Sequence, residues 1–159
     1  MILNLKDSSA NKTGKFISRF GNTFFDGANG NNTTTKLVIN CEDGVTINTC
    51  YDYQGNEMNS FSGGMTYFLN NVSKNVEINN AHLVIGAIAM VNNGYTVTFK
   101  NCTIESRNSN GVLQGGSGNI VYDACTITTV MQSSSGNVLD SSDPNVTFIN
   151  GTTVNGVTK

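Results

Sequence analysis

Short stretches in which apolar and polar residues alternate recur along the chain. Each stretch has an apolar residue at its first position and another two positions later, as expected of a strand with one buried face. The stretches begin at residues 76, 97, 120 and 146, so they are spaced by 21, 23 and 26 residues. A repeat of this length predicts strands stacked in successive layers, because no single unit can bury its own hydrophobic face.

The aligned repeat predicts which side chains fill the core. An asparagine column lies four positions after each start, and we expect its side-chain amides to face an inward corner and to hydrogen-bond along the stack, with Ala124 interrupting it. Small residues lie one position later, and we interpret Cys102 and Cys125 there as stacked buried thiols, with a disulfide as the alternative. The predicted core set is Val76, Val97, Ile120, Val146, Ile78, Phe99, Tyr122, Phe148, Cys102, Cys125, Asn80, Asn101 and Asn150.

Each repeat also predicts three short strands, which in one copy are residues 96–99, 102–106 and 111–114. Corners rich in glycine, asparagine and serine separate them. A large apolar residue precedes each repeat start by seven positions and indicates the third strand: Leu69, Met90, Leu113 and Leu139.

The repeat fades toward the N-terminus. Two further strands are expected around residues 37–39 and 45–47, so residues 36–159 form the predicted repeat domain. Residues 1–35 do not repeat, and we expect them to form an end cap or an attachment arm, since the end of a strand stack needs covering.

Composition supports β structure with many turns. Charged residues make up 13% of the chain, against an average of about 25%, while 38% are hydrophobic and the net charge is -2. Only two arginines, Arg19 and Arg107, occur, which argues against nucleic acid as a partner. The start lacks the pattern of a secretory signal and no run approaches the ~18 apolar residues of a membrane span, so we expect synthesis in a cytoplasm without membrane insertion.

The candidate chemistry is sparse, and we predict no catalytic residue, no cofactor and no metal. The four cysteines have no C-x-x-C spacing, and His82 is the single histidine. The acids near the repeats occupy no common column, whereas glycoside hydrolysis needs two carboxylates close together; they are Glu77, Glu105, Asp123 and Asp140. An outward threonine column, Thr103, Thr126 and Thr152, is the candidate surface-binding feature.

The repeat resembles the right-handed parallel β-helix of the pectin-lyase-like solenoid family across about residues 65–159. That resemblance implies an all-β, single-stranded solenoid of about 4–6 short coils with three strands per coil. An antiparallel β-sandwich remains the alternative fold, because spaced short strands also describe that class. The family's lyases use clustered aspartates with calcium and a basic residue, and no such cluster is evident in this sequence.

A repetitive chain rich in asparagine, glycine, serine and threonine is also similar to bacteriophage fibres, tailspikes and capsid decoration proteins. The resemblance implies a non-enzymatic virion protein that docks to the particle through its N-terminal segment. Its corner loops at 105–111 and 128–137 would contact a host glycan. Four residues expected in exposed apolar rows, Tyr67, Phe68, Val84 and Val91, suggest a homotrimer. The alternatives are a polysaccharide-degrading tailspike and a secreted adhesin or ice-binding solenoid.

Overall fold

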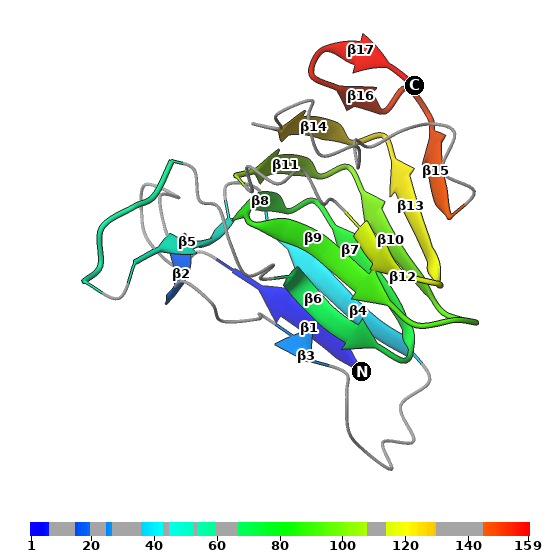
Figure 1. Ribbon diagram of the computed structural model, residues 1–159, viewed down its shortest axis with the longest axis horizontal. Coiled ribbons are helices and arrows are strands. Elements are labelled where there is room, and N and C mark those ends of the chain that lie inside the picture. Colours follow the sequence, from blue (N-terminus) through cyan, green and yellow to red (C-terminus); the bar gives the residue numbers. More distant parts are fainter. Residues whose placement is uncertain are drawn as a thin grey trace.

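The structure is a computed structural model, and it describes residues 1–6, 15–19, 25–26, 36–42, 45–52, 54–59, 67–107, 114–129 and 145–159. Every regular element in these ranges is a β-strand, which confirms the all-β prediction (Figure 1). Across the same ranges, no helix is long and apolar enough to cross a membrane.

The strands form three sheets. Sheet A contains, in spatial order, β1 (Ile2–Leu5), β4 (Lys36–Cys41), β7 (Asn75–Asn79), β10 (Thr96–Lys100), β13 (Asn119–Asp123) and β15 (Val146–Ile149). Sheet B contains β17 (Val157–Thr158), β16 (Thr153–Val154), β14 (Thr126–Thr129), β11 (Thr103–Ser106), β8 (His82–Ile85), β5 (Thr46–Tyr51) and β2 (Lys15–Arg19). Sheet C contains β12 (Gln114–Gly116), β9 (Ala87–Val91), β6 (Tyr67–Val72) and β3 (Phe25–Asp26).

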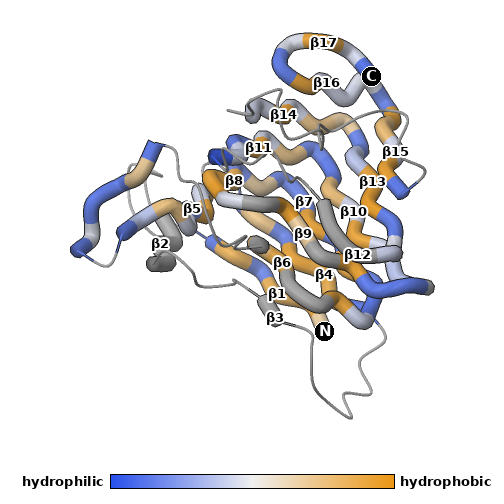
Figure 2. Tube along the Cα trace, viewed as in Figure 1, coloured by the Kyte–Doolittle hydropathy of each residue, from blue (hydrophilic) through white to orange (hydrophobic). Residues whose placement is uncertain are grey.

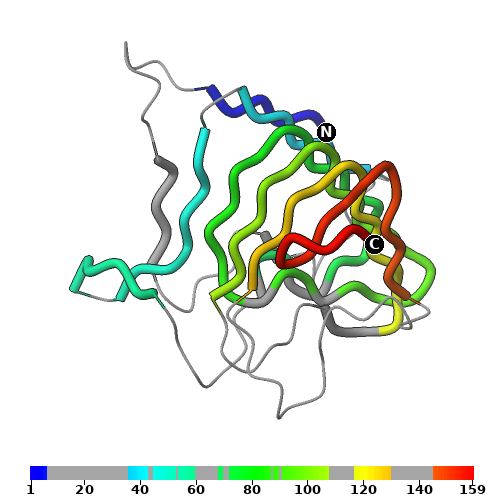
Figure 3. The backbone as a smooth tube through the Cα atoms, turned by 90° about the horizontal axis from the view of Figure 1, so that it is seen from above, coloured from blue at the N-terminus to red at the C-terminus, as the bar shows by residue number. Residues whose placement is uncertain are grey.

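The chain visits the sheets in a repeating order. β1, β2 and β3 belong to sheets A, B and C, and β4 to β6, β7 to β9 and β10 to β12 follow the same order. We call one such passage a round, and Figure 3 shows successive rounds following similar bent paths side by side. Parallel neighbours need a connection of a dozen residues or more, and the strands of the other two sheets supply it.

Strands of successive rounds pair in parallel in all three sheets. Among the described strands, the antiparallel pair is β16 with β17, a hairpin at the C-terminal end of sheet B. The antiparallel β-sandwich considered from the sequence is therefore wrong, because that class requires antiparallel pairing throughout both sheets.

Register in sheet A coincides with the sequence alignment. Val97 pairs with Val76 and Ile120, and Ile120 pairs with Val146. Buried residues alternate with exposed or partly exposed ones along β7, β10 and β13. Figure 2 shows that hydrophobic and hydrophilic residues alternate along these strands. Because successive residues of a strand point to opposite faces, this register places every apolar first position toward the interior.

Two positions further along the same inward face, aromatic rings form a second column. The centroids of Phe99 and Tyr122 are 5.4 Å apart with their planes 12° from parallel, and those of Tyr122 and Phe148 are 5.6 Å apart at 17°. Phe99 and Tyr122 are fully buried, whereas Phe148 is partly buried in the last strand of sheet A. Stacked rings at this separation add to the area that they bury.

At the corner between sheets A and B, short side chains that are hydrogen-bond donors link each round to the one before it. The Cys102 thiol donates to the Ile78 carbonyl at 3.4 Å, and the Cys125 thiol donates to that of Phe99 at 3.3 Å. Both are buried free thiols, and contact with Cys125, together with burial, raises the pKa of Cys102, so this sulfur keeps its proton. Each thiol thereby satisfies a buried carbonyl one round away.

Thr152 takes the same place in the last round, which corrects its expected outward position. Its side chain is fully buried, and Oγ1 donates to the Tyr122 carbonyl at 2.9 Å. Asp123 pairs with Ile149, and four residues rather than three lead from there to the next strand, so the corner at Asn150 and Gly151, which both have positive φ, contains one extra residue. Thr153 consequently pairs with Thr126.

The asparagine column is the second correction. Asn80, Asn101 and Asn150 are exposed rather than inward, and their φ angles are 58°, 51° and 54°. Ala124 holds the same conformation at 52°. Asparagine tolerates the left-handed region better than other residues with a side chain, so the column reflects backbone geometry at a tight corner rather than buried amides.

The third strand of each round departs from the expected column. Leu69 pairs with Ala89 rather than Met90, one residue short of the expected column, and the register of β6 and β9 shifts by a further residue between Leu69 and Val72. Leu113 and Leu139 lie outside the described residues.

Strands from both sides of residue 35 pair with one another, and the expected division into a cap (residues 1–35) and a repeat domain (residues 36–159) stays a prediction. β1 pairs with β4, β2 with β5 and β3 with β6, so strands from both sides belong to the same sheets. Attachment through this N-terminal segment stays a prediction.

Most of the apolar rows expected at the surface are buried. Phe68, Val84 and Val91 expose 1%, 5% and 0% of their surface. Consecutive residues Phe68 and Leu69 are both buried, so β6 is covered on both faces, which its sequence does not reveal. The side chain of Tyr67 lies outside the described part of the chain.

The Tyr122 hydroxyl gives a test of the aromatic column. It is buried and has no hydrogen-bond partner among the described residues. Because an unsatisfied buried hydroxyl costs about 1–3 kcal/mol, we expect Tyr122→Phe to raise the free energy of unfolding by about 1 kcal/mol. Tyr122→Ala should lower it by about 3–5 kcal/mol. Urea denaturation measures both, and a marked loss of stability in the phenylalanine variant would contradict the unpartnered hydroxyl.

The corner geometry gives a second test. Left-handed backbone costs a residue such as alanine about 1–2 kcal/mol, and less for asparagine. We expect Ala124→Asn to stabilise the protein by about 0.5–1 kcal/mol and Asn101→Ala to destabilise it by a similar amount. The melting temperatures of the two variants should shift in opposite directions from that of the wild type. Equal shifts in one direction would show that the corner is governed by side-chain contacts instead.

Candidate functional site

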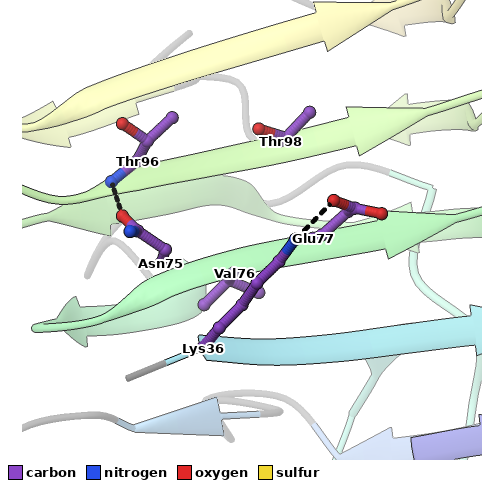
Figure 4. Close-up of a pocket in the computed structure, with 6 residues that line it drawn as sticks. All are labelled: Lys36, Asn75, Val76, Glu77, Thr96 and Thr98. Carbon is purple, nitrogen blue, oxygen red and sulfur yellow. Dashed lines mark hydrogen bonds and ion pairs between the residues drawn. The ribbon is translucent and has the colours of Figure 1, made fainter. Parts of the chain in front are cut away.

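A groove of about 250 Å³ lies on the outer face of sheet A. Its lining residues come from three neighbouring strands, β4, β7 and β10, and Figure 4 shows Lys36 reaching Glu77 and Asn75 reaching the backbone nitrogen of Thr96. The polar side chains lie on this face because the strand alternation turns Val76 toward the interior. The lining residues are Lys36, Asn75, Val76, Glu77, Thr96 and Thr98.

Glu77 is the hub of the groove. Oε2 accepts a hydrogen bond from Lys36 Nζ at 2.9 Å and lies 3.6 Å from Lys100 Nζ. Oε1 accepts from Asn79 Nδ2 at 3.1 Å. The Lys36 and Asn79 hydrogen bonds, with a smaller effect of Lys100, hold the pKa of Glu77 below its ordinary value, so this carboxylate is ionised near neutral pH.

The upper wall of the groove belongs to β10. Thr98 pairs with Glu77 in the sheet register, and both Thr96 and Thr98 are partly exposed (Figure 4). The Thr96 backbone N–H donates to Asn75 Oδ1 at 3.0 Å, which fixes that amide with its nitrogen available.

An asparagine ladder continues the polar face beside the groove. Asn79 Nδ2 donates to Asn40 Oδ1 at 2.8 Å, and Asn40 Nδ2 donates to Asn4 Oδ1 at 3.0 Å. This amide ladder crosses β1, β4 and β7 on the outer surface, and it is distinct from the buried amide column that the sequence predicted at the corner.

A second polar cluster lies on sheet B and is structural. Arg107 Nη1 donates to Glu57 Oε1 at 2.9 Å and to the Met58 carbonyl at 2.8 Å, while its Nε donates to Glu105 Oε1 at 2.7 Å. Asn48 Nδ2 also donates to Glu57 Oε1, at 3.1 Å. Arg107 is 7% exposed, so it holds segment 54–59 against the strands that carry Asn48 and Glu105.

The predicted threonine site is only partly assembled. Thr103 and Thr126 are exposed neighbours on sheet B, but Thr152 is buried and makes no contribution to that surface. The same outward column contains Thr46 and His82, whose side chains lie 3.2 Å apart between Oγ1 and Nδ1.

Of the four acids considered from the sequence, the structure describes three, among which Glu77 lines the groove and Glu105 and Asp123 do not. Glu105 is bound to Arg107, and Asp123 accepts from Asn150 Nδ2 at 2.7 Å. Asp140 lies outside the described residues, as do 108–111 and 130–137 of the expected host-contact loops.

Sequence reasoning missed Lys36 as a site residue, because the repeat was not followed upstream of residue 76. The signal was present, since aligning Leu37 with Val76 places Lys36 beside Asn75, as the register does.

The described carboxylates with shifted pKa values are all held ionised. Hydrogen bonds from Asn56 lower the pKa of Asp52, and the Arg107 hydrogen bond does the same for Glu57, as Lys36 does for Glu77. A glycosidase acid needs the opposite shift, so that it keeps a proton near neutral pH. The groove suits ligand binding through hydrogen bonds and charge. Within the described ranges, no three histidine, cysteine or acidic side chains gather as metal ligands.

Glu77 gives a pH-dependent test. A lowered folded-state pKa stabilises the protein above the unfolded value of about 4.3, and this stabilisation disappears as the pH falls through the folded-state pKa. We expect Glu77→Gln to be less stable than the wild type by about 1 kcal/mol at neutral pH, with the difference shrinking as the pH falls below the unfolded-state pKa of about 4.3. Melting temperatures across this range measure it. Thr147→Ser, on the same exposed column, is the control and should follow the wild-type profile.

Comparison of the chain with protein-family models, with curated proteins and with solved structures gives no match.

Proposed function

We propose that the chain is a parallel β-helix that serves as a non-enzymatic structural subunit of a bacteriophage particle, a head or tail fibre or decoration protein, with a role in binding host-surface glycans. The observation that carries the proposal is the parallel register of sheet A, in which equivalent residues of six strands stack along one axis. A chain built this way is a rigid column whose outer faces are free for contacts.

The N-terminal strand supports attachment to a larger assembly. Met1, Ile2 and Leu3 expose 65%, 68% and 40% of their surface, and β1 is the last strand of sheet A at that end. An exposed apolar edge strand offers both unpaired backbone groups and hydrophobic area to a partner. This edge suits docking to other virion proteins, or contact between copies in the proposed homotrimer.

The groove chemistry weighs against the polysaccharide-degrading alternative. Glu77 is paired with lysines and Glu105 with Arg107, so both carboxylates are engaged as ion-pair partners. The proposed location is the virion, with synthesis in the host cytoplasm.

Particle association is the experiment that tests this function. Mass spectrometry of purified phage particles from the source culture should detect the chain in a fixed ratio to the capsid proteins. Ile2→Lys should lower its incorporation at least about tenfold, because a charge placed in an apolar contact is costly. Val157→Lys is the matched control, since Val157 is 61% exposed at the opposite end of the stack. Absence of the chain from the particles would overturn the proposal.

A further inference from the structure

We infer that the groove on sheet A binds the sulfate or phosphate ester group of a saccharide, with Lys36 and Lys100 as the charged contacts; this inference rests on the proposed glycan-binding role and names its site and ligand class. Lys36 lines the groove and Lys100 lies beside it, and both ammonium groups approach the same oxygen of Glu77.

The charge balance of the groove favours an anion. Lys36 and Lys100 both approach Glu77 Oε2, at 2.9 and 3.6 Å. At Glu77 two ammonium groups meet one carboxylate, an excess of about one positive charge at that point. Asp123 lies beside Lys100 in the register of the next strand, where it accepts a hydrogen bond from Asn150, so the excess is centred on Lys36. The lysine side chains are 52% and 41% exposed, so each can reach a ligand while still near Glu77.

The remaining hydrogen-bonding capacity is mostly that of donors. Both oxygens of Glu77 are engaged, and its side chain is only 20% exposed. Asn75 uses its oxygen to accept from Thr96, which leaves its amide nitrogen to donate. A neutral sugar hydroxyl needs acceptors as well as donors, whereas a sulfate or phosphate ester offers oxygens that only accept.

Geometry favours a tetrahedral ester over a planar carboxylate. The donors come from three strands, Lys36 on β4, Asn75 on β7 and Thr98 with Lys100 on β10. Neighbouring strands lie about 4.8 Å apart, so the donors are spread over about 10 Å. An ester with three terminal oxygens can meet donors from several directions, and the attached saccharide can lie along the groove.

The competition between Glu77 and the ligand gives the site a distinctive signature. Glu77 and an incoming ester oxygen both require the same ammonium groups. Removing the Glu77 charge should therefore strengthen ligand binding while it weakens the fold. If Glu77 only stabilised the fold, removing its charge would weaken ligand binding and stability together.

Isothermal titration calorimetry with four forms of one trisaccharide tests the inference: unmodified, sulfated, phosphorylated and carboxymethylated. The full chain should bind the sulfated and phosphorylated forms at least about tenfold more tightly than the other two, with the stronger of these esters identifying the natural group. Lys36→Met and Lys100→Met should each weaken that binding by about tenfold, and Glu77→Gln should tighten it by about threefold. Lys159→Met, exposed and distant in sequence from the groove strands, is the matched control and should have no effect.

Circular dichroism and melting curves separate loss of binding from loss of fold. Equal binding of all four trisaccharides, or of free inorganic sulfate and phosphate as tightly as the esters, would overturn the inference. So would unchanged ester binding in folded Lys36→Met and Lys100→Met proteins. If the chain is present in phage particles but does not prefer the esters, the proposed virion function stands and this inference is rejected. If the chain binds the esters but is absent from the particles, the virion function is rejected and the ester site stands.

Discussion

Parallel pairing between equivalent strands of successive rounds is the constraint on which the rest of the structure depends. The backbone groups of an inner strand find their partners only in the rounds before and after it, so a change of register in one round is felt in its neighbours. That register places Val76, Val97 and Ile120 in one line. It also dictates the corner, where a left-handed residue must turn the chain from sheet A to sheet B within two or three positions.

Part of this arrangement was readable from the sequence because burial imposes a simple rule. Apolar residues at alternate positions, such as Val97 and Phe99, indicate a buried strand face. The recurrence of this alternation indicates which strands stack in successive layers. The rule weakens upstream, since the next equivalent of Val76 is Leu37, at a much longer spacing than the later repeats. Long connections hide a repeat even when the strands pair in register. The strand at β4 was therefore expected but not aligned with the later repeats, and the segment containing β1 was assigned to an end cap or arm.

Other features could not be predicted, because one residue type fits two physical explanations. An asparagine column is expected both of buried amide ladders and of left-handed corners, and Asn101 alone does not distinguish them. The single extra residue at Gly151 moves Thr152 inward, and only backbone geometry reveals it. The groove escaped notice for a different reason. The Lys36 and Glu77 pair joins residues 41 apart, so its formation depends on the stack itself.

The same stack influences what chemistry the outer face can support. Side chains on a parallel sheet recur at a nearly constant distance across the strands, so opposite charges in adjacent rounds readily meet, as Glu77 does with two lysines. Such meetings lower carboxylate pKa values, whereas acid catalysis needs a carboxyl group that burial keeps protonated. A flat, evenly spaced polar face therefore favours recognition over proton transfer. The Glu77 carboxylate also keeps the Lys36 and Lys100 ammonium groups close to one oxygen, which would reduce the conformational entropy lost by these side chains in the proposed ligand complex.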